Sequence, residues 1–214
     1  MLERRLPSSQ ALLIRGYEFL MSSRLSLLVA APLMLATTSF DFTAPRDTVP
    51  PASGNLHLIA DLSSHRLKMY EADTLVWQYP ISDGTGGYPT PTGEYKIRKL
   101  VWNPSWTPPP GAKWAAKYKA QEPGSPANPM KIVKIFFHEP DYYSHGTAET
   151  GRLGNAASHG CIRMDPEHVA EVAQYVMNHG GQARPESWFW RVLHFRSEEK
   201  PIYLTKPIPL TIQR

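Results

Sequence analysis

Proline limits what this chain can fold into more than any other residue type. The 214 residues include 21 prolines and 14 glycines, and proline disrupts helix interiors and central strands alike. We therefore expect little helix, short strands and long ordered loops. Hydrophobic residues make up 42% of the chain and charged residues 20%, a balance typical of a globular protein and not of a disordered one.

Alternating apolar and polar residues predict a mainly β domain from residue 55 onward. The predicted strands cover residues 56–62, 66–72, 74–82, 94–102 and 131–137. Segments rich in glycine and proline separate some of them, at residues 83–94 and 103–129. A loop as long as the second is uncommon inside a domain unless it serves as a lid or a binding loop, so we expect such a role for it.

A helix is predicted to begin behind Asp165. This residue is a favourable N-cap, and Pro166 fits the first helical position. Apolar residues recur at helical spacing from Val169 onward, and the glycines of segment 178–181 stop the helix. Residues 185–195 predict a second, short helix.

The C-terminal tail, residues 201–212, alternates like a strand but contains several prolines. Because proline cannot donate a backbone hydrogen bond, we expect an edge strand or a hairpin and not a strand at the centre of the sheet. The chain is thus predicted to form one mainly β domain with long loops and one or two helices.

The N-terminus has the pattern of an export signal. Arg24 precedes an apolar run of twelve residues, 25–36, which has the length of a signal-peptide core and is short for a membrane span. We therefore expect residues 1–40 to be a signal peptide or an N-terminal anchor, with Met21 as an alternative start, and residues 41–54 to be a linker. The expected location is the periplasm or the cell wall.

The charge balance argues against a nucleic-acid partner. The formal net charge is only +4, whereas a nucleic-acid-binding protein carries a clustered basic face.

The single cysteine, Cys161, lies in the segment SHGCIRM, residues 158–164. One cysteine cannot form an internal disulfide, and a free thiol outside the cytoplasm is at risk of oxidation. A cysteine acts as a nucleophile only as the thiolate, so it needs a nearby base or cation. His159 precedes Cys161 by two residues and His145 by sixteen. The connection 147–157 can fold back as a hairpin and bring His145 beside the thiol.

The residues alone leave three interpretations of this cysteine open. The first is a buried cysteine that packs as a small hydrophobic residue. The second is a Cys/His acyl-transfer site, in which Gly160 lets the backbone approach a substrate and provides N–H groups for an oxyanion hole. The third is a zinc site formed by Cys161 with His138, His145 and His159.

The segment SHGTAETGRLGNAASHGCIRM resembles the signature of L,D-transpeptidase catalytic domains (YkuD-type), which has HGT, a short variable loop and SHGCIRM. The segments TPTGEYKI (90–97) and NPSWTPPP (103–110) resemble two further stretches of this family. The resemblance covers roughly residues 55–177. It implies a mainly β sandwich or barrel, a cysteine nucleophile, no cofactor, and action on peptidoglycan stem peptides outside the cytoplasmic membrane.

The resemblance implies a role for each residue around the thiol. Cys161 is the nucleophile, and His145 is its base and later its acid. The carbonyl group of Gly146 orients the imidazole, and His159 supports the nucleophile without being the primary base. Gly160 and Cys161 supply backbone donors to the oxyanion.

Residues further from the thiol have an implied role and an alternative. Arg163 is a natural partner for a stem-peptide carboxylate, and a structural ion pair with a nearby acid such as Asp165 is its alternative. Ser158 and Thr147 are hydrogen-bond supports or plain turn residues.

Three tryptophans and a C-terminal extension complete the expectations. Trp106, like Trp102 and Trp114, either contacts the substrate, by stacking on glycan rings or lining a lid, or serves packing alone. The catalytic domain is expected to cover residues 55–214, including an extension from about residue 180.

The resemblance favours a transpeptidase that joins two diaminopimelate-type stems through a thioester and releases D-Ala. Three alternatives stay enzymatic: an L,D-carboxypeptidase, an amidase that detaches a wall-bound protein, and an enzyme that attaches a lipoprotein lysine to the wall. A non-catalytic wall-binding domain is the fourth, and the intact His145 and Cys161 argue against it.

Overall fold

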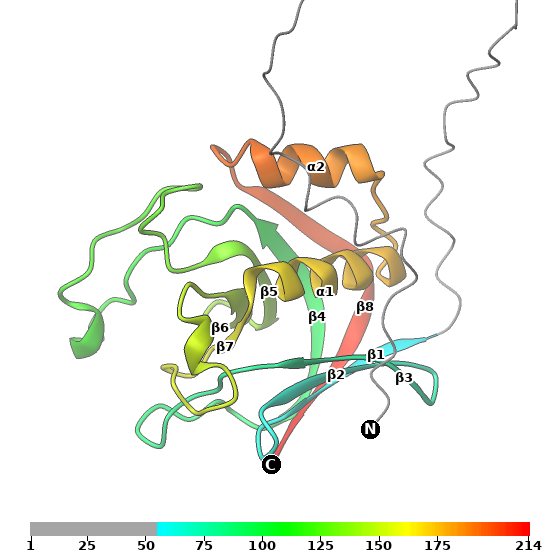
Figure 1. Ribbon diagram of the computed structural model, residues 1–214, viewed down its shortest axis with the longest axis horizontal. Coiled ribbons are helices and arrows are strands. Elements are labelled where there is room, and N and C mark those ends of the chain that lie inside the picture. The colour runs from blue at the N-terminus through cyan, green and yellow to red at the C-terminus, as the bar shows by residue number, and fades with distance from the viewer. Residues whose placement is uncertain (1–54) are drawn as a thin grey trace, which may run out of the picture. The chain divides into compact units, whose positions relative to one another are not determined.

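Strand pairing organises the part of the chain that the structure describes, residues 55–214 of a computed structural model (Figure 1). Eight strands in these residues form one sheet in the order β3-β2-β1-β8-β4-β5-β6-β7. They are β1 (Leu56–Asp61), β2 (Arg66–Glu71), β3 (Thr74–Pro80), β4 (Gly93–Trp102), β5 (Lys131–His138), β6 (Tyr142–Gly146), β7 (Ile162–Met164) and β8 (Lys200–Gln213). The expected mainly β fold is confirmed.

A backbone bridge joins the two ends of this sheet. β3 and β7 lie at opposite ends of the strand order. Ser82, just after β3, nevertheless exchanges two backbone hydrogen bonds with Arg163 of β7, at 2.9 and 2.8 Å. The sheet is therefore nearly closed, and the loop after Ser82 is tied to the strand that follows Cys161.

The five strands predicted from alternation are all present, with ends shifted by at most two residues. β6 and β7 were not predicted, because five and three residues are too few to show a clear alternation. These two strands pair in parallel. The expected hairpin between His145 and Cys161 is therefore wrong, since parallel neighbours need a crossover connection.

The prediction for the C-terminal tail is also wrong. β8 lies between β1 and β4, parallel to β1 and antiparallel to β4. Its pairing with β1 involves residues 210–213 only, and Pro201, Pro207 and Pro209 all precede them. Before residue 210, β8 pairs with β4 alone, and its other side has no partner strand. A proline whose missing N–H would face that unpaired side breaks no ladder hydrogen bond.

Two helices cover parts of the sheet, as predicted. α1 (Pro166–His179) begins at its N-cap Asp165, whose carboxylate accepts a hydrogen bond of 2.8 Å from the Glu167 N–H. Its buried face packs against β5, β6 and β8, and Figure 1 shows the helix lying across the sheet. α2 (Glu186–His194) buries Phe189 against the core indole of Trp102.

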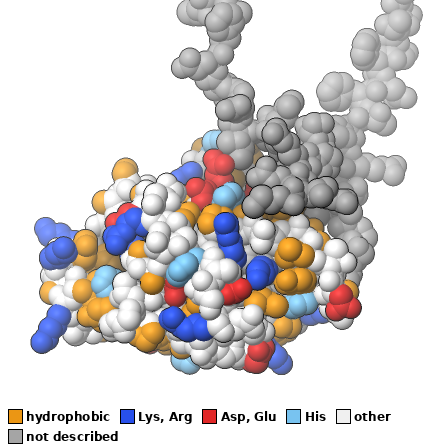
Figure 2. All heavy atoms as spheres, turned by 60° about the horizontal axis from the view of Figure 1, so that its bottom comes forward, with side chains coloured by type: hydrophobic (Ala, Val, Ile, Leu, Met, Phe, Trp, Pro, Cys, Tyr) orange, Lys and Arg blue, Asp and Glu red, His pale blue; other side chains and the backbone are white. Residues whose placement is uncertain are grey.

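The predicted signal peptide or anchor (1–40) and linker (41–54) lie outside the described residues. Within residues 55–214, neither helix is long and apolar enough to cross a membrane. Figure 2 shows basic side chains spread over one face of the domain, with acidic and hydrophobic side chains between them.

Candidate active site

The parallel pairing of β6 and β7 brings three of the predicted site residues, His145, Cys161 and Arg163, to one face of the sheet. His145 is in register with Arg163, and Ser144 with Ile162. Side chains two residues apart on a strand share a face of the sheet. Tyr143 therefore lies on the face of His145, and Cys161 on that of Arg163, which is the same face. The opposite face belongs to the core, where Ile162 is fully buried.

His145 is a neutral base in this site. Its side chain is buried, and Nδ1 lies 2.7 Å from the carbonyl oxygen of Gly146. A carbonyl only accepts, so Nδ1 carries the proton and Nε2 keeps its lone pair. Burial lowers the pKa of His145 to about 3; the carbonyls of Gly146 and Pro129 oppose this shift, and the cations Arg163 and Lys134 add to it. The orienting contact predicted for Gly146 is therefore present.

Cys161 is a half-buried free thiol. In this conformation Sγ donates to the carbonyl oxygen of Asp141 at 3.5 Å and not to His145. Burial raises the pKa of the thiol, whereas the Tyr143 backbone and phenol and the cations Lys134 and Arg163 act in the opposite direction. The resting thiol is thus protonated at neutral pH, among groups that favour its thiolate.

Two hydroxyl groups fix the backbone around the thiol. Ser158 Oγ accepts from the Gly160 N–H at 3.0 Å and donates to the Cys161 carbonyl at 2.6 Å. Thr90 is buried, and its Oγ1 accepts from the Gly84 N–H at 2.8 Å and donates to the Gly160 carbonyl at 2.9 Å. Ser158 is therefore a hydrogen-bond support and does not depend on substrate for its partners.

These contacts decide which N–H group can serve an oxyanion. The peptide between Gly160 and Cys161 is planar and trans, so a carbonyl held by Thr90 points the Cys161 N–H the opposite way. The Gly160 N–H, in contrast, is already bound to Ser158. The expected donation from both residues is thus corrected for this conformation: Cys161 N–H is the candidate donor, and Gly160 provides the turn, with φ of +109°.

His159 joins two loops. The His159 ring stacks on Trp114 at 4.0 Å and contacts the edge of Tyr88 at 4.9 Å. Burial and the charge of Arg163 lower its pKa. His159 therefore holds the long loop against the loop that follows β3.

Arg163 forms an ion pair with a nearby acid, as the structural alternative expected, and this acid is Glu149. Its Nη1 lies 2.8 Å from Glu149 Oε2, whereas Asp165 caps α1. The Glu149 N–H in turn donates to Thr147 Oγ1 at 3.1 Å. Thr147 thus supports the turn that places Glu149 against Arg163.

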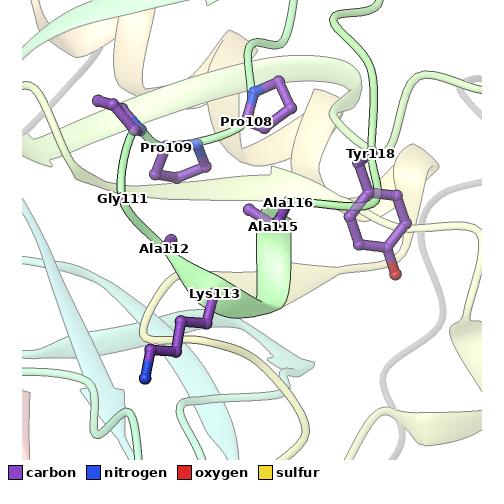
Figure 3. A pocket seen from close by; sticks show the side chains of 9 residues that line it. Pro108, Pro109, Gly111, Ala112, Lys113, Ala115, Ala116 and Tyr118 are labelled. Atoms are coloured by element: carbon purple, nitrogen blue, oxygen red, sulfur yellow. The ribbon is translucent and has the colours of Figure 1, made fainter.

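Trp106 does not present its ring to a ligand, which corrects its expected substrate role. It is buried, packs on Tyr118 at 5.9 Å and exchanges backbone hydrogen bonds with Gln121 across the long loop. Trp102 belongs to the core, and Trp114 is the tryptophan beside the site. A cavity of about 420 Å³ lies in the same loop, with Pro108 and Pro109 on one arm and Tyr118 on the other (Figure 3).

Three further residues belong to the site and were given no role from the sequence. Thr90 lies in the segment TPTGEYKI, but composition does not reveal its hydrogen bonds. Lys134 is opposite His145 in the pairing of β5 with β6, and Tyr143 lies beneath its ammonium at 4.9 Å. Lys134 and Tyr143 could be predicted only from the register of β5 with β6. That register could not be predicted without first recognising β6 as a strand.

The alternative of a zinc site finds no ligand set in the described residues. No three His, Cys, Asp or Glu side chains within residues 55–214 lie close enough together to hold a metal ion. His138, one of the four candidates, lies at the end of β5 against the ring of Tyr142 at 5.9 Å.

Known proteins similar to this chain are L,D-transpeptidases. Residues 55–188 match the family described as L,D-transpeptidase catalytic domain. A putative L,D-transpeptidase YkuD from Bacillus licheniformis is 33% identical over 132 residues, covering 62% of this chain and 64% of that protein. The probable L,D-transpeptidase ErfK/SrfK of Escherichia coli is 28% identical over 146 residues, covering 65% and 47%. A solved L,D-transpeptidase from Mycobacterium smegmatis has a TM-score of 0.49 at 16% identity, over 76% of this chain and 60% of that chain.

The chain belongs to the family of L,D-transpeptidase catalytic domains, since the family match covers more than half of its length. The resemblance of the HGT and SHGCIRM segments is thereby confirmed. The chain spans less than two thirds of the length of the two curated relatives.

The lowered pKa of His145 predicts a specific loss of stability in acid. Below about pH 6.5 the unfolded chain protonates this histidine, and the folded chain does not until about pH 3. The free energy of unfolding should therefore fall by roughly 3 kcal/mol between pH 6.5 and 4 through this residue alone. His145→Gln should lack that part of the decline in urea unfolding measured across this range.

The exposed His138 provides the matched control. His138→Gln should keep the acid sensitivity of the unsubstituted protein. Equal pH slopes for the unsubstituted protein and His145→Gln would contradict the burial of a neutral imidazole.

Proposed function

We propose that this protein is a peptidoglycan L,D-transpeptidase with Cys161 as nucleophile and His145 as base. One observation carries the proposal: a buried, neutral imidazole, its Nδ1 proton held by Gly146, shares a face of the sheet with the chain's only thiol. Family membership supplies the reaction type. The geometry supports the assignment because a base must be neutral before it can accept the thiol proton.

The acylation step follows from this arrangement. Nε2 of His145 takes the proton from Cys161 Sγ, and the thiolate attacks the carbonyl carbon between the L-centre and D-Ala of a tetrapeptide stem. The Cys161 N–H stabilises the resulting oxyanion. The imidazolium then gives its proton to the leaving amine, the C–N bond breaks, and D-Ala departs from a thioester.

The second step transfers the acyl group to an acceptor. A neutral amine of another stem attacks the thioester carbon, and His145 takes the excess proton and returns it to the departing thiolate. The products are a new amide and free Cys161, so no cofactor is required. This chemistry suits the exported location proposed from the apolar run at 25–36, because it draws only on an existing peptide bond.

Arg163 has the chemistry to select the donor stem. A guanidinium binds a carboxylate in a bidentate manner, and Glu149 occupies it at 2.8 Å in this conformation. A stem carboxylate would displace Glu149 and take its place. The His159–Trp114 stack would meanwhile hold the long loop over the bound peptide.

The function is tested by the products formed from tetrapeptide stems. Purified protein incubated with diaminopimelate-type stems should yield a cross-linked dimer and free D-Ala, measured by mass spectrometry. Tripeptide without dimer would instead identify a carboxypeptidase. No product from stems would contradict the proposal, and a lipoprotein or wall-bound protein would then be tested as substrate.

The roles of the two histidines predict different effects on acylation. A carbapenem-like β-lactam should form one adduct per chain, and Cys161→Ala should abolish it, since the chain has no other cysteine. His145→Gln should slow acylation about a hundredfold or more, as expected for a lost general base. His159→Gln should slow it less, because that ring contacts Trp114 and Tyr88. A larger effect at His159 in stopped-flow measurements would reverse the assignment.

Thr90 predicts a difference between two reactions of the same thiol. Thr90→Val removes the donor to the Gly160 carbonyl and frees the Cys161 N–H to reorient. β-Lactam acylation, which develops an oxyanion, should slow about tenfold or more. Iodoacetamide alkylation, which develops none, should keep its rate.

Thr90→Ser is the matched control and should restore acylation, because it keeps the hydroxyl group. Both rates follow from intact mass. Equal slowing of acylation and alkylation by Thr90→Val would show a general disturbance of the thiol and contradict the oxyanion role.

A further inference from the structure

An ammonium group without an acidic partner lies beside the thiol. Lys134 projects from β5, and its Nζ donates to the Ser105 carbonyl at 2.9 Å. Among residues 55–214, no carboxylate lies within ion-pair distance of it. Burial lowers the pKa of Lys134, and the charges of Glu199 and Cys161 oppose that shift. The Ser105 carbonyl accepts from one of the three N–H donors of the ammonium and, being neutral, does not form an ion pair with it.

A backbone irregularity places this lysine. Lys131 is opposite Gly146 and Lys134 is opposite His145, so β5 inserts two extra residues against a single step of β6. Ile132, inside this bulge, has φ of +72°, a region that β-branched residues rarely adopt. Bulges re-aim side chains beside active sites, and such strain persists where the surrounding structure enforces it.

The bulge directs Lys134 toward the thiol side of the sheet. Its Nζ lies over the ring of Tyr143 at 4.9 Å. Ser144 of β6 is in register with Ile162 of β7. Tyr143 and Cys161 each come one residue earlier, so they lie beside each other. The ring of Tyr143 also contacts His145 at 5.7 Å. The lysine, the phenol, the imidazole and the thiol thus form one cluster.

The other charged groups near this cluster are Arg163, Glu199 and Asp141, of which Asp141 is exposed. Arg163 of β7 is paired with Glu149 at 2.8 Å. Glu199, before β8, binds the Ser105 N–H and hydroxyl group, at 2.5 and 2.7 Å, and not the ammonium. His145 is neutral, and Tyr143 is a half-buried phenol. Of the two cations that lower the pKa of Cys161, Arg163 is in an ion pair and Lys134, among the described residues, is not.

We propose that Lys134 supplies the positive charge that stabilises the Cys161 thiolate. The inference deepens the proposed function and rests on Cys161 as its nucleophile. The ammonium attracts the negative charge on sulfur and disfavours a proton on His145. The charge therefore favours the thiolate over the thiol, and in the later step it favours transfer of the proton from the imidazolium to the leaving amine.

The pH dependence of alkylation tests this role in the full chain. Iodoacetamide reacts with the thiolate, and Cys161 is the only cysteine, so intact mass reports its ionisation alone. Lys134→Met and Lys134→Gln keep an unbranched side chain of similar length and remove the charge. Each should raise the midpoint of the pH–rate profile by about one pH unit or more. Lys134→Arg should keep the midpoint near that of the unsubstituted protein.

Lys99 offers a matched control on the neighbouring strand. It is opposite Phe136 and paired with Glu139 at 2.9 Å. Lys99→Met also removes one positive charge from the sheet, but Glu139 already compensates that charge. It should therefore move the midpoint of the pH–rate profile much less. An equal shift for Lys99→Met and Lys134→Met would overturn the specific role of Lys134.

Two further outcomes would overturn the proposal. An unchanged midpoint in folded Lys134→Met and Lys134→Gln would do so, and a raised KM for stems with that unchanged midpoint would assign Lys134 to a substrate carboxylate instead. Near-ultraviolet circular dichroism checks folding. Failure of the proposed function is a separate result: the unsubstituted protein would show the Lys134-dependent midpoint and yet form no product from stems.

Discussion

The pairing of β6 with β7 is the constraint on which the rest of the site depends. A parallel register places His145 beside Arg163 and therefore puts Cys161 on the same face of the sheet. A shift by one residue would send the imidazole into the core and expose core residues instead. The buried Ile162 opposes that shift, because its side chain belongs to the same hydrophobic core as the buried face of α1. Hydrophobic burial on one face thus fixes the chemistry on the other.

Hydrogen bonds and charge refine what the register sets. Gly146 fixes the tautomer of His145, and Thr90 fixes the direction of the Cys161 N–H. Both contacts are made in the resting protein, so no reorganisation is needed when charge develops during attack. Burial raises the pKa of the thiol and lowers that of the imidazole. In the resting site the thiol and the imidazole are therefore both neutral. Nearby cations such as Lys134 lower the pKa of the thiol and so favour its thiolate.

The sequence predicted local structure well and tertiary placement poorly. Strands with clear alternation and the helix capped by Asp165 were predictable, because those signals depend on neighbours in the chain. The central position of β8 was not, since its tolerance of Pro209 depends on where pairing with β1 begins. Cys161 and His145 were recognisable from their motif. Lys134 was not, because a bulge and a register with β6 bring it to the site, and neither is visible as a local pattern.

The central claim is that Cys161 becomes acylated by a stem peptide with loss of D-Ala. Rapid acid quench of the protein with a tetrapeptide stem, followed by intact mass and peptide mapping, measures this directly. The account predicts an adduct equal to the stem minus D-Ala, on the peptide that contains Cys161, and its discharge by an added amine. A stem that is processed while Cys161 stays unmodified at every quench time, or an adduct on another residue, would contradict it.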